Sequence, residues 1–170
     1  MRSDAMSQNQ EKIILRRASP DDSDFLFSLR NDPVVISTST SGAGVEINEH
    51  LRWLARVCES DAHLLCIIES RDSGERVGYS RLDRRDSSDA IMTIAIVEEW
   101  RSRSIGRSSI AETARLGFEH WQEVNCVLAY VKAGNKASES AFLHGGFRLH
   151  DKPDKEGHHL YSIERSISNA

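Results

Sequence analysis

The segment 94–108 combines residue types that suit the binding of a phosphate group. An apolar stretch, 94–97, runs into a turn that carries Arg101, Arg103 and Arg107, and the turn leads into a helical pattern. The first N–H groups of a helix have no partner within the helix and lie at the positive end of its dipole, so they attract anions. Arginine adds paired donors that match phosphate oxygens. The segment therefore predicts a site for a phosphate or a pyrophosphate.

The composition narrows the class of protein. A chain of 170 residues is typical of one domain that buries a core without disulfides or metals. Its 22 basic and 26 acidic residues give a net charge of -4, which argues against a dedicated nucleic-acid-binding protein. Three cysteines without C-x-x-C spacing favour a reduced, cytoplasmic setting. No apolar run reaches the length of a membrane span, so we expect no membrane partner.

Alternating patterns along the chain predict the elements that position the arginine-rich turn. We expect a flexible tail at 1–11 and a single domain at 12–170. Strands are predicted at 13–17, 63–69, 76–82, 90–97, 126–131, 147–150 and 159–163. Helices are predicted at 20–31, 48–59, 106–122 and 135–144, and the Ser/Thr/Gly-rich stretch 34–45 is predicted to be a loop. This order indicates a mixed α+β sheet.

The order of elements and the motif Arg103-Ser104-Ile105-Gly106-Arg107-Ser108 resemble the GNAT superfamily of acyl-CoA-dependent N-acetyltransferases. The family's phosphate cradle is Arg/Gln-x-x-Gly-x-Gly/Ala, and here Ser104 stands where a glycine is usual. Asn135 and Gly145-Gly146-Phe147 follow at the expected distances, so the resemblance spans about 12–167. It implies an α+β fold with a mixed, mostly antiparallel central sheet and about four helices packed on both faces.

The resemblance also implies acetyl-CoA as co-substrate and no metal. The main chain at 94–97 is expected to lie along the pantetheine arm, residues 102–108 to hold the pyrophosphate, and an asparagine to bond the pantetheine amides. The cofactor-binding residues implied are Ile94, Ala95, Ile96, Val97, Ser102, Arg103, Ser104, Ile105, Gly106, Arg107, Ser108 and Asn135.

Two catalytic positions of the family hold residues that cannot exchange a proton. The family's thiolate-protonating tyrosine corresponds to Phe142, and a base often found on the cradle-bearing strand corresponds to Ile91. Tyr130 is our candidate proton donor, although a purely structural role on its strand is equally compatible. His50 is our candidate base, because an unperturbed histidine has a pKa of about 6.5. A packed His50–Trp53 pair one helical turn apart, or a water chain acting as base, is the alternative.

A finer resemblance lies in the first third of the chain. Leu29-Arg30-Asn31-Asp32-Pro33 and Glu49-His50-Leu51-Arg52-Trp53 are similar to enzymes that acetylate 4-amino sugars on nucleotide carriers. The same pieces occur in ribosomal-protein-type acetyltransferases. The resemblance implies that 31–53 line the acceptor side, with these substrate-binding candidates: Asn31, Glu46, His50 and Trp53.

The favoured partner is therefore a small-molecule amine. A protein N-terminal amine remains an alternative acceptor. A non-catalytic CoA-binding module is a further alternative, because of Phe142 and Ile91. The sequence leaves a homodimer open.

Overall fold

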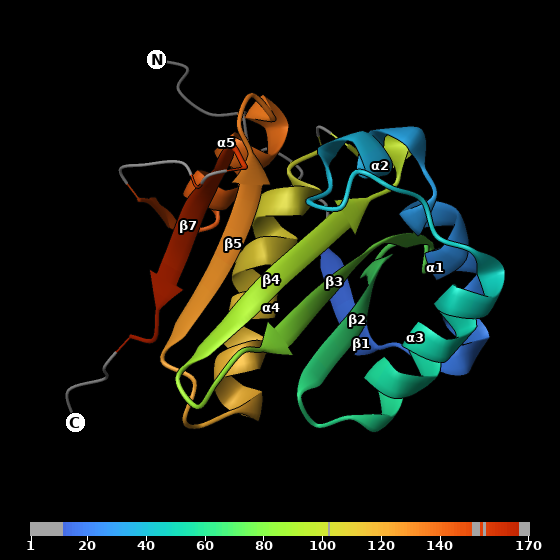
Figure 1. Ribbon diagram of the computed structural model, residues 1–170, viewed down its shortest axis with the longest axis horizontal. Helices are drawn as coiled ribbons and strands as arrows, with labels where there is room; N and C mark the ends of the chain where they lie inside the picture. The colour runs from blue at the N-terminus through green and yellow to red at the C-terminus, as the bar shows by residue number, and fades with distance from the viewer. Residues whose placement is uncertain (1–11, 102, 151–153, 155, 167–170) are drawn as a thin grey trace, which may run out of the picture.

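The computed structural model describes residues 12–101, 103–150, 154 and 156–166. Figure 1 shows an open, twisted sheet with helices on both faces. The predicted tail at 1–11 and the cofactor candidate Ser102 lie outside the described residues.

The described residues form one sheet in the order β1-β2-β3-β4-β5-β7-β6. Neighbouring strands are antiparallel except β4 and β5, which are parallel. The predicted mixed, mostly antiparallel sheet is therefore confirmed. The strands are β1 (Ile13–Arg17), β2 (His63–Ser70), β3 (Arg76–Arg84), β4 (Asp89–Ile96), β5 (Cys126–Lys132), β6 (Arg148–Leu149) and β7 (His158–Glu164).

The helices flank the sheet, with α1 and α3 on one face and α4 on the other (Figure 1). None of the helices in the described part of the chain is long and apolar enough to span a bilayer. The α-helices are α1 (Ser23–Arg30), α2 (Pro33–Thr38), α3 (Ile47–Glu59), α4 (Ile105–His120) and α5 (Lys136–His144), and two short 3-10 helices are η1 (Pro20–Asp22) and η2 (Glu98–Trp100).

Each face of the sheet has its own apolar core. On the α1–α3 face, Leu26 and Leu54 pack with Tyr79 of β3. On the α4 face, Leu82 of β3 packs with Ile110 and other buried side chains. Each fully buried aliphatic side chain stabilises such a core by about 1.5–3 kcal/mol. Helix α4 lies close to the sheet at Gly117, where a Cβ would stand 2.3 Å from Leu82 Cδ1.

The sequence analysis predicted a loop where α2 lies. Asp32 Oδ1 accepts hydrogen bonds from the backbone N–H groups of Val34 (2.9 Å) and Val35 (3.0 Å), which caps this helix. Pro33 occupies its first position, where the missing N–H costs nothing. The β-branched residues that follow have low helix propensity. The cap and the proline together therefore outweigh this low propensity.

The parallel strands β4 and β5 pair over only three residues. Asp89–Ile91 pair with Cys126–Leu128, and beyond these the ladder ends. Figure 1 shows the two strands diverging towards their carboxyl ends. Among the described residues, main-chain groups of β4 beyond Ile91 therefore have no strand partner on the β5 side, and they are available to a ligand.

Candidate active site

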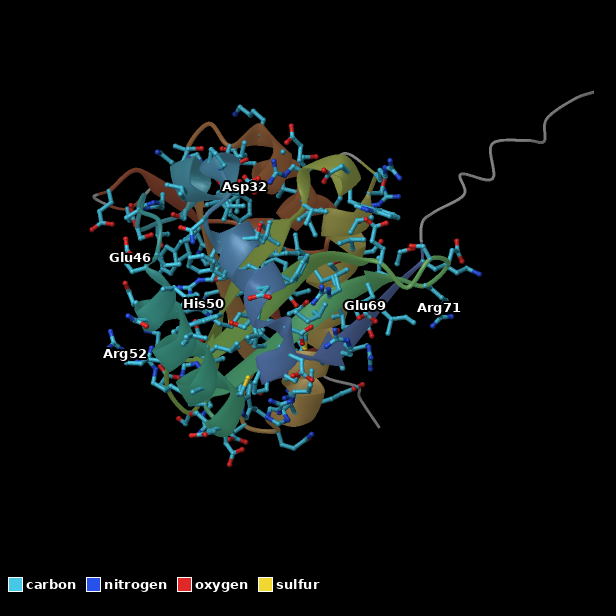
Figure 2. The ribbon with its side chains drawn as sticks, turned by 90° about the vertical axis from the view of Figure 1, so that its right-hand side faces the viewer. Asp32, Glu46, His50, Arg52, Glu69 and Arg71 are labelled. Carbon is cyan, nitrogen blue, oxygen red and sulfur yellow. The ribbon has the colours of Figure 1, made fainter. Side chains whose placement is uncertain are left out.

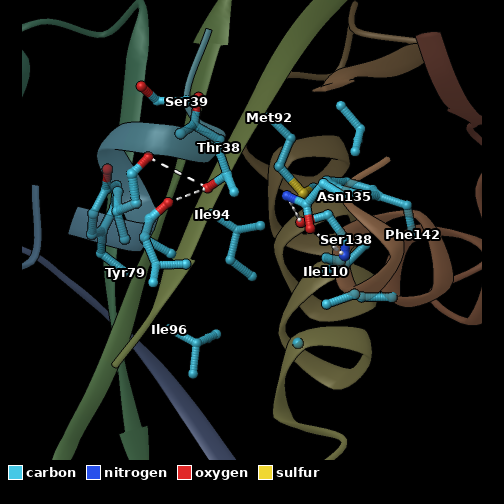
Figure 3. A pocket seen from close by; sticks show the side chains of 18 of the residues that line it. Thr38, Ser39, Tyr79, Met92, Ile94, Ile96, Ile110, Asn135, Ser138 and Phe142 are labelled. Atoms are coloured by element: carbon cyan, nitrogen blue, oxygen red, sulfur yellow. Dashed lines mark hydrogen bonds between the residues drawn. The ribbon is translucent and has the colours of Figure 1, made fainter. Parts of the chain in front are cut away.

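A cavity of about 730 Å³ occupies the opening between β4 and β5. Its walls come from α1, α2 and the loop after α2, from β3 and β4, from the start of α4, and from β5 and α5. Figure 3 shows Ile94 and Ile96 of β4 between α2 on one side and Ile110 and Phe142 on the other. The cavity thus joins the two faces of the sheet at the point where the strands separate.

The cradle predicted at the start of α4 forms one end of this cavity. Ser104 precedes the helix in the left-handed conformation, with φ 63°, a geometry that costs a non-glycine residue about 1–2 kcal/mol. Ser108 N–H and Oγ–H both donate to the Ser104 carbonyl. The amides of 105–107 remain without helical partners, and Ser104, Gly106 and Arg107 line the cavity.

The three arginines of the turn have different surroundings. Arg101 lines the cavity, but its Nε donates to the Ile96 carbonyl (2.9 Å) and its Nη2 to Asp32 Oδ1 (3.1 Å). It therefore ties the turn to the cap of α2. Arg103 lies over the Trp100 ring, with Cζ 4.8 Å from the centroid, and does not line the cavity. Arg107 lines the cavity and has no ion-pair partner among the described residues.

The other cofactor candidates lie along the same wall. Ile94, Ala95 and Ile96 line the cavity, whereas Val97 donates its N–H to the Val77 carbonyl (2.9 Å) and lies beyond it. Ile105 is buried and does not line the cavity. Asn135 lines the cavity and also caps α5, since its Oδ1 accepts from the Ser138 N–H (3.3 Å).

Phe142 and Tyr130 both reach the cavity wall. Phe142 is buried against Phe147 and Tyr161, with ring centroids 5.0 and 6.0 Å away. Tyr130 is half-buried, and its hydroxyl has no hydrogen bond within the described residues. It also lines a second cavity of about 500 Å³, and Thr40 likewise lines both cavities.

The second cavity contains a cluster of acid–base groups. It is lined by Asp154, Glu156 and His158. One carboxylate oxygen of each acid and one ring nitrogen of the histidine all lie within 4.8 Å of one another. His158 Nδ1 is 3.3 Å from Asp154 Oδ2. The N–H groups of His158 and Glu156 donate to Asp154, and these bonds lower the pKa of its carboxyl.

His50, the predicted base, is fully buried and does not line the cavity. Arg30 Nη1 is 3.1 Å from Nδ1, and the Ser23 carbonyl is 3.0 Å from Nε2. Because a guanidinium only donates, Nδ1 must accept and Nε2 must carry the proton. Burial, together with the Arg30 charge, lowers the pKa of His50. The geometry therefore gives no support to a base at His50.

The other predicted acceptor residues surround the cavity without lining it. Trp53 is 8% exposed and lies behind Arg30 and Arg81. Asn31 holds the loop before α3 in place. Its Nδ2 donates to the Val45 carbonyl, and its Oδ1 accepts from the Val45 N–H. Glu46 is exposed just before α3, on the outer side of the molecule in Figure 2.

The sequence analysis missed the side chains that do line this end, namely Arg30, Tyr79 and Arg81. Arg30 stands in the Arg-Asn-Asp-Pro motif, next to the predicted substrate-binding residue Asn31. Tyr79 and Arg81 alternate along β3 and so share a face. Arg81 pairs with Asp83 (2.9 Å), which also contacts His63 Nδ1 (2.7 Å).

Arginine provides the charged side chains of the cavity wall, and two of the four arginines pair with an aspartate. Within the described part of the chain, no aspartate or glutamate lines the 730 Å³ cavity, whereas Arg30, Arg81, Arg101 and Arg107 do. The wall therefore attracts anions at two places. One is the start of α4, and the other is the region where α1 meets β3.

A family model described as an acetyltransferase (GNAT) domain matches residues 12–148. None of the curated protein sequences matches the chain.

Solved structures share the fold at low sequence identity. A domain from Methanocaldococcus jannaschii has a TM-score of 0.79 and 19% identity, over 91% of this chain and 99% of that chain. An aminoglycoside acetyltransferase solved with coenzyme A has a TM-score of 0.76 and 14% identity, over 91% and 95%. A spermidine N-acetyltransferase from Vibrio cholerae, solved with CoA and spermine, has a TM-score of 0.76 and 15% identity, over 89% and 95%. At these identities the likeness establishes the shared fold.

Proposed function

The chain belongs to the GNAT acetyltransferase family and is an acetyl-CoA-dependent N-acetyltransferase, and we propose that it acetylates a primary amine of a small molecule. A 4-amino sugar on a nucleotide carrier is the favoured acceptor. The observation that carries this proposal is one continuous cavity of about 730 Å³, which extends from the start of α4 to Arg30, Tyr79 and Arg81. Such a cavity has room for a donor at one end and a small acceptor at the other.

The donor is proposed to enter from the α4 side. The amides of 105–107 and the Arg107 guanidinium would hold the pyrophosphate, and the pantetheine arm would follow the unpaired edge of β4 at 94–96. The thioester would then lie where β4 and β5 separate. A backbone N–H of β4 would donate to the carbonyl oxygen as negative charge develops on it, an interaction worth about 3–4 kcal/mol in acyl transfer.

The reaction is proposed to be direct transfer. The amine nitrogen attacks the thioester carbon, the C–N bond forms, and collapse of the tetrahedral intermediate breaks the C–S bond and releases the CoA thiolate. We assign proton donation to the thiolate to Tyr130, which lines the cavity. Because no carboxylate among the described residues lines this cavity, we assign removal of the ammonium proton to water. His144 on the wall of this cavity and the His158–Asp154 pair of the second cavity are the acid–base groups around it.

Turnover of acetyl-CoA with a panel of amines tests the proposal. The panel contains an amino-sugar nucleotide, an aminoglycoside, spermidine and a peptide with a free N-terminus, and each product is identified by mass. We expect the largest kcat/KM among the small molecules. A preference for the peptide would instead identify a protein N-terminal acetyltransferase. CoA binding without acetylation of any amine would identify a non-catalytic CoA-binding module.

A further inference from the structure

We propose that Arg30 forms an anion subsite for the acceptor, so that the favoured acceptor amine also carries a carboxylate or a phosphate group. The inference rests on the proposed function, in which the α1–β3 end of the cavity receives the acceptor. It differs from the phosphate cradle of the donor, because the cradle lies at the start of α4 on the opposite face of the sheet.

The surroundings of Arg30 fix its guanidinium in place. It is the last residue of α1, is partly buried, and lines the cavity. Its Cζ lies 3.9 Å from the centroid of the Trp53 ring, so the ring supports one face of the guanidinium. His50 Nδ1 accepts one N–H. The same His50 donates to the Ser23 carbonyl, which keeps its lone pair directed at Arg30.

Most of the hydrogen-bonding capacity of Arg30 remains unused. A guanidinium has five N–H donors, and the bond to His50 is the one side-chain bond that Arg30 makes among the described residues. A pre-oriented planar fork of this kind matches two oxygens of a carboxylate or phosphate. Because stacking and the His50 bond already restrict the side chain, little rotamer entropy is lost when an anion binds.

Arg30 also lacks the carboxylate partner that its neighbours have. Arg81 pairs with Asp83 at 2.9 Å and Arg101 with Asp32 at 3.1 Å, but no ion pair in the described part of the chain includes Arg30. Burial is the main cause that lowers the pKa of Arg30, and the Arg81 charge adds to it, whereas Tyr79 and Glu49 act in the opposite direction. A partly buried cation without a counter-ion is costly, and an anionic group on the ligand would offset that cost.

The one-sided charge of the wall disfavours polycationic acceptors. No acidic side chain among the described residues lines the cavity, so nothing there pairs with the several ammonium groups of a polyamine. An acceptor with one reacting amine and one anionic group avoids this repulsion. The chain therefore differs in its expected acceptor from proteins of the same fold that are named for spermidine or aminoglycosides.

Binding of matched probes to the CoA-saturated protein tests the subsite, since bound CoA blocks the donor cradle. The probe pairs are glucosamine phosphate against glucosamine, and L-threonine against L-threoninamide, with uridine diphosphate as an anion that has no amine. Calorimetry should show that the anionic member of at least one pair binds about ten- to a hundredfold more tightly, as expected for a hydrogen bond to a charged group. The first pair and uridine diphosphate report a phosphate, and the second pair reports a carboxylate.

Arg30→Gln should abolish the affinity ratio between the anionic probe and its neutral partner. Arg52→Gln, a change on the exposed side of α3, should leave this ratio unchanged. If Arg30→Gln does not fold, Arg30→Lys, which keeps the charge but not the fork, should reduce the ratio in a protein with an unchanged melting temperature. The proposal is overturned if every anionic probe binds no better than its neutral partner, or if the ratio survives in Arg30→Gln. If the wild-type protein binds the anionic probe more tightly but acetylates no amine, the proposed function is rejected and the anion subsite stands.

Discussion

At the scale of single residues, two aromatic side chains of the cavity wall differ in whether they carry a proton that can be donated. Phe142 is buried between Phe147 and Tyr161 and has no proton to give, although it stands where the family resemblance places a tyrosine. Tyr130 lines the same cavity from β5 with a hydroxyl that has no partner among the described residues. The neighbouring Ala129 and Val131 belong to the α4-face core. Strand alternation therefore directs Tyr130 to the opposite face of the sheet, which α1 and α3 cover.

If Tyr130 protonates the leaving thiolate, Tyr130→Phe should lower kcat and leave the KM for acetyl-CoA nearly unchanged. General acid catalysis contributes about 10²–10⁴-fold, and we expect the lower end, because a thiol of pKa about 8.5 is a fair leaving group without help. Steady-state kinetics with the true acceptor measure the change. Tyr161→Phe is the matched control, since Tyr161 is buried and lies outside the cavity wall. A full kcat in Tyr130→Phe would leave water as the donor.

For His50 we predict an effect of pH on the stability of the fold rather than a role in catalysis. Its folded pKa is lowered, mainly by burial, so between that value and about 6.5 the unfolded chain binds more protons than the folded one. Stability is therefore lost as the pH falls through this window. His50→Gln can still donate to the Ser23 carbonyl but does not titrate.

Melting temperatures of wild type and His50→Gln, measured from pH 7.5 to about pH 5, should thus converge as the pH falls. Each kcal/mol that wild type loses relative to the variant corresponds to about 2–4 °C for a domain of this size. The other histidines are common to both proteins, so the difference isolates His50. Parallel curves would mean that His50 has an ordinary pKa.

At the scale of elements, the start of α4 is the part of the site that the sequence describes best. An apolar strand, a turn and a helix follow one another as predicted, because the signals are local. The sequence does not show which arginine faces the cavity, because Arg101 pairs with a residue from a distant segment. Arg101 is drawn to Asp32 and Arg103 lies over Trp100, whereas Arg107 lines the cavity.

This difference predicts that Arg107→Gln weakens CoA binding about tenfold, as expected for one charge-assisted hydrogen bond. Arg103→Gln should change it by less than about twofold, the scale of exposed charge contacts. Calorimetry with CoA measures both variants, and pantetheine, which lacks the pyrophosphate, serves as the reference ligand. Equal effects of the two substitutions on CoA, or equal affinities of CoA and pantetheine, would remove the phosphate cradle from the proposed function.

The acceptor side shows why the remainder of the site could not be predicted. A capping residue followed by proline begins two helical segments, Ser19-Pro20 at η1 and Asp32-Pro33 at α2. A β-branched run follows Asp32-Pro33 within the Ser/Thr/Gly-rich stretch 34–45, and the sequence analysis predicted a loop there. Arg30 was within a recognised motif, yet its place at the cavity depends on Trp53 and His50 of α3. Packing between helices that are distant in sequence decides which polar side chain faces the ligand, and periodicity does not encode it.

At the scale of the whole molecule, two separately packed layers meet at the gap between β4 and β5. The α1–α3 layer carries Arg30, and the α4 side carries Arg107. Each layer has its own apolar cluster. The proposed acceptor and donor ends of the cavity are therefore built on different layers, and the integrity of one layer can be perturbed while the other is kept.

Trp53 offers such a perturbation. It is 8% exposed within the α1–α3 cluster, so Trp53→Ala should cost about 3–5 kcal/mol of unfolding free energy, a large share of the roughly 5–15 kcal/mol typical of a domain. In the protein that remains folded, Arg30 loses the ring beneath it, so the acceptor KM should rise more than the KM for acetyl-CoA. Trp53→Phe keeps an aromatic face and should lose less stability and raise the acceptor KM less.

Denaturant unfolding measures the stability of both variants, and steady-state kinetics give the two KM values. Equal increases in both KM values would show that Trp53 supports the whole domain rather than the acceptor layer, and unchanged stability would contradict its place in the core.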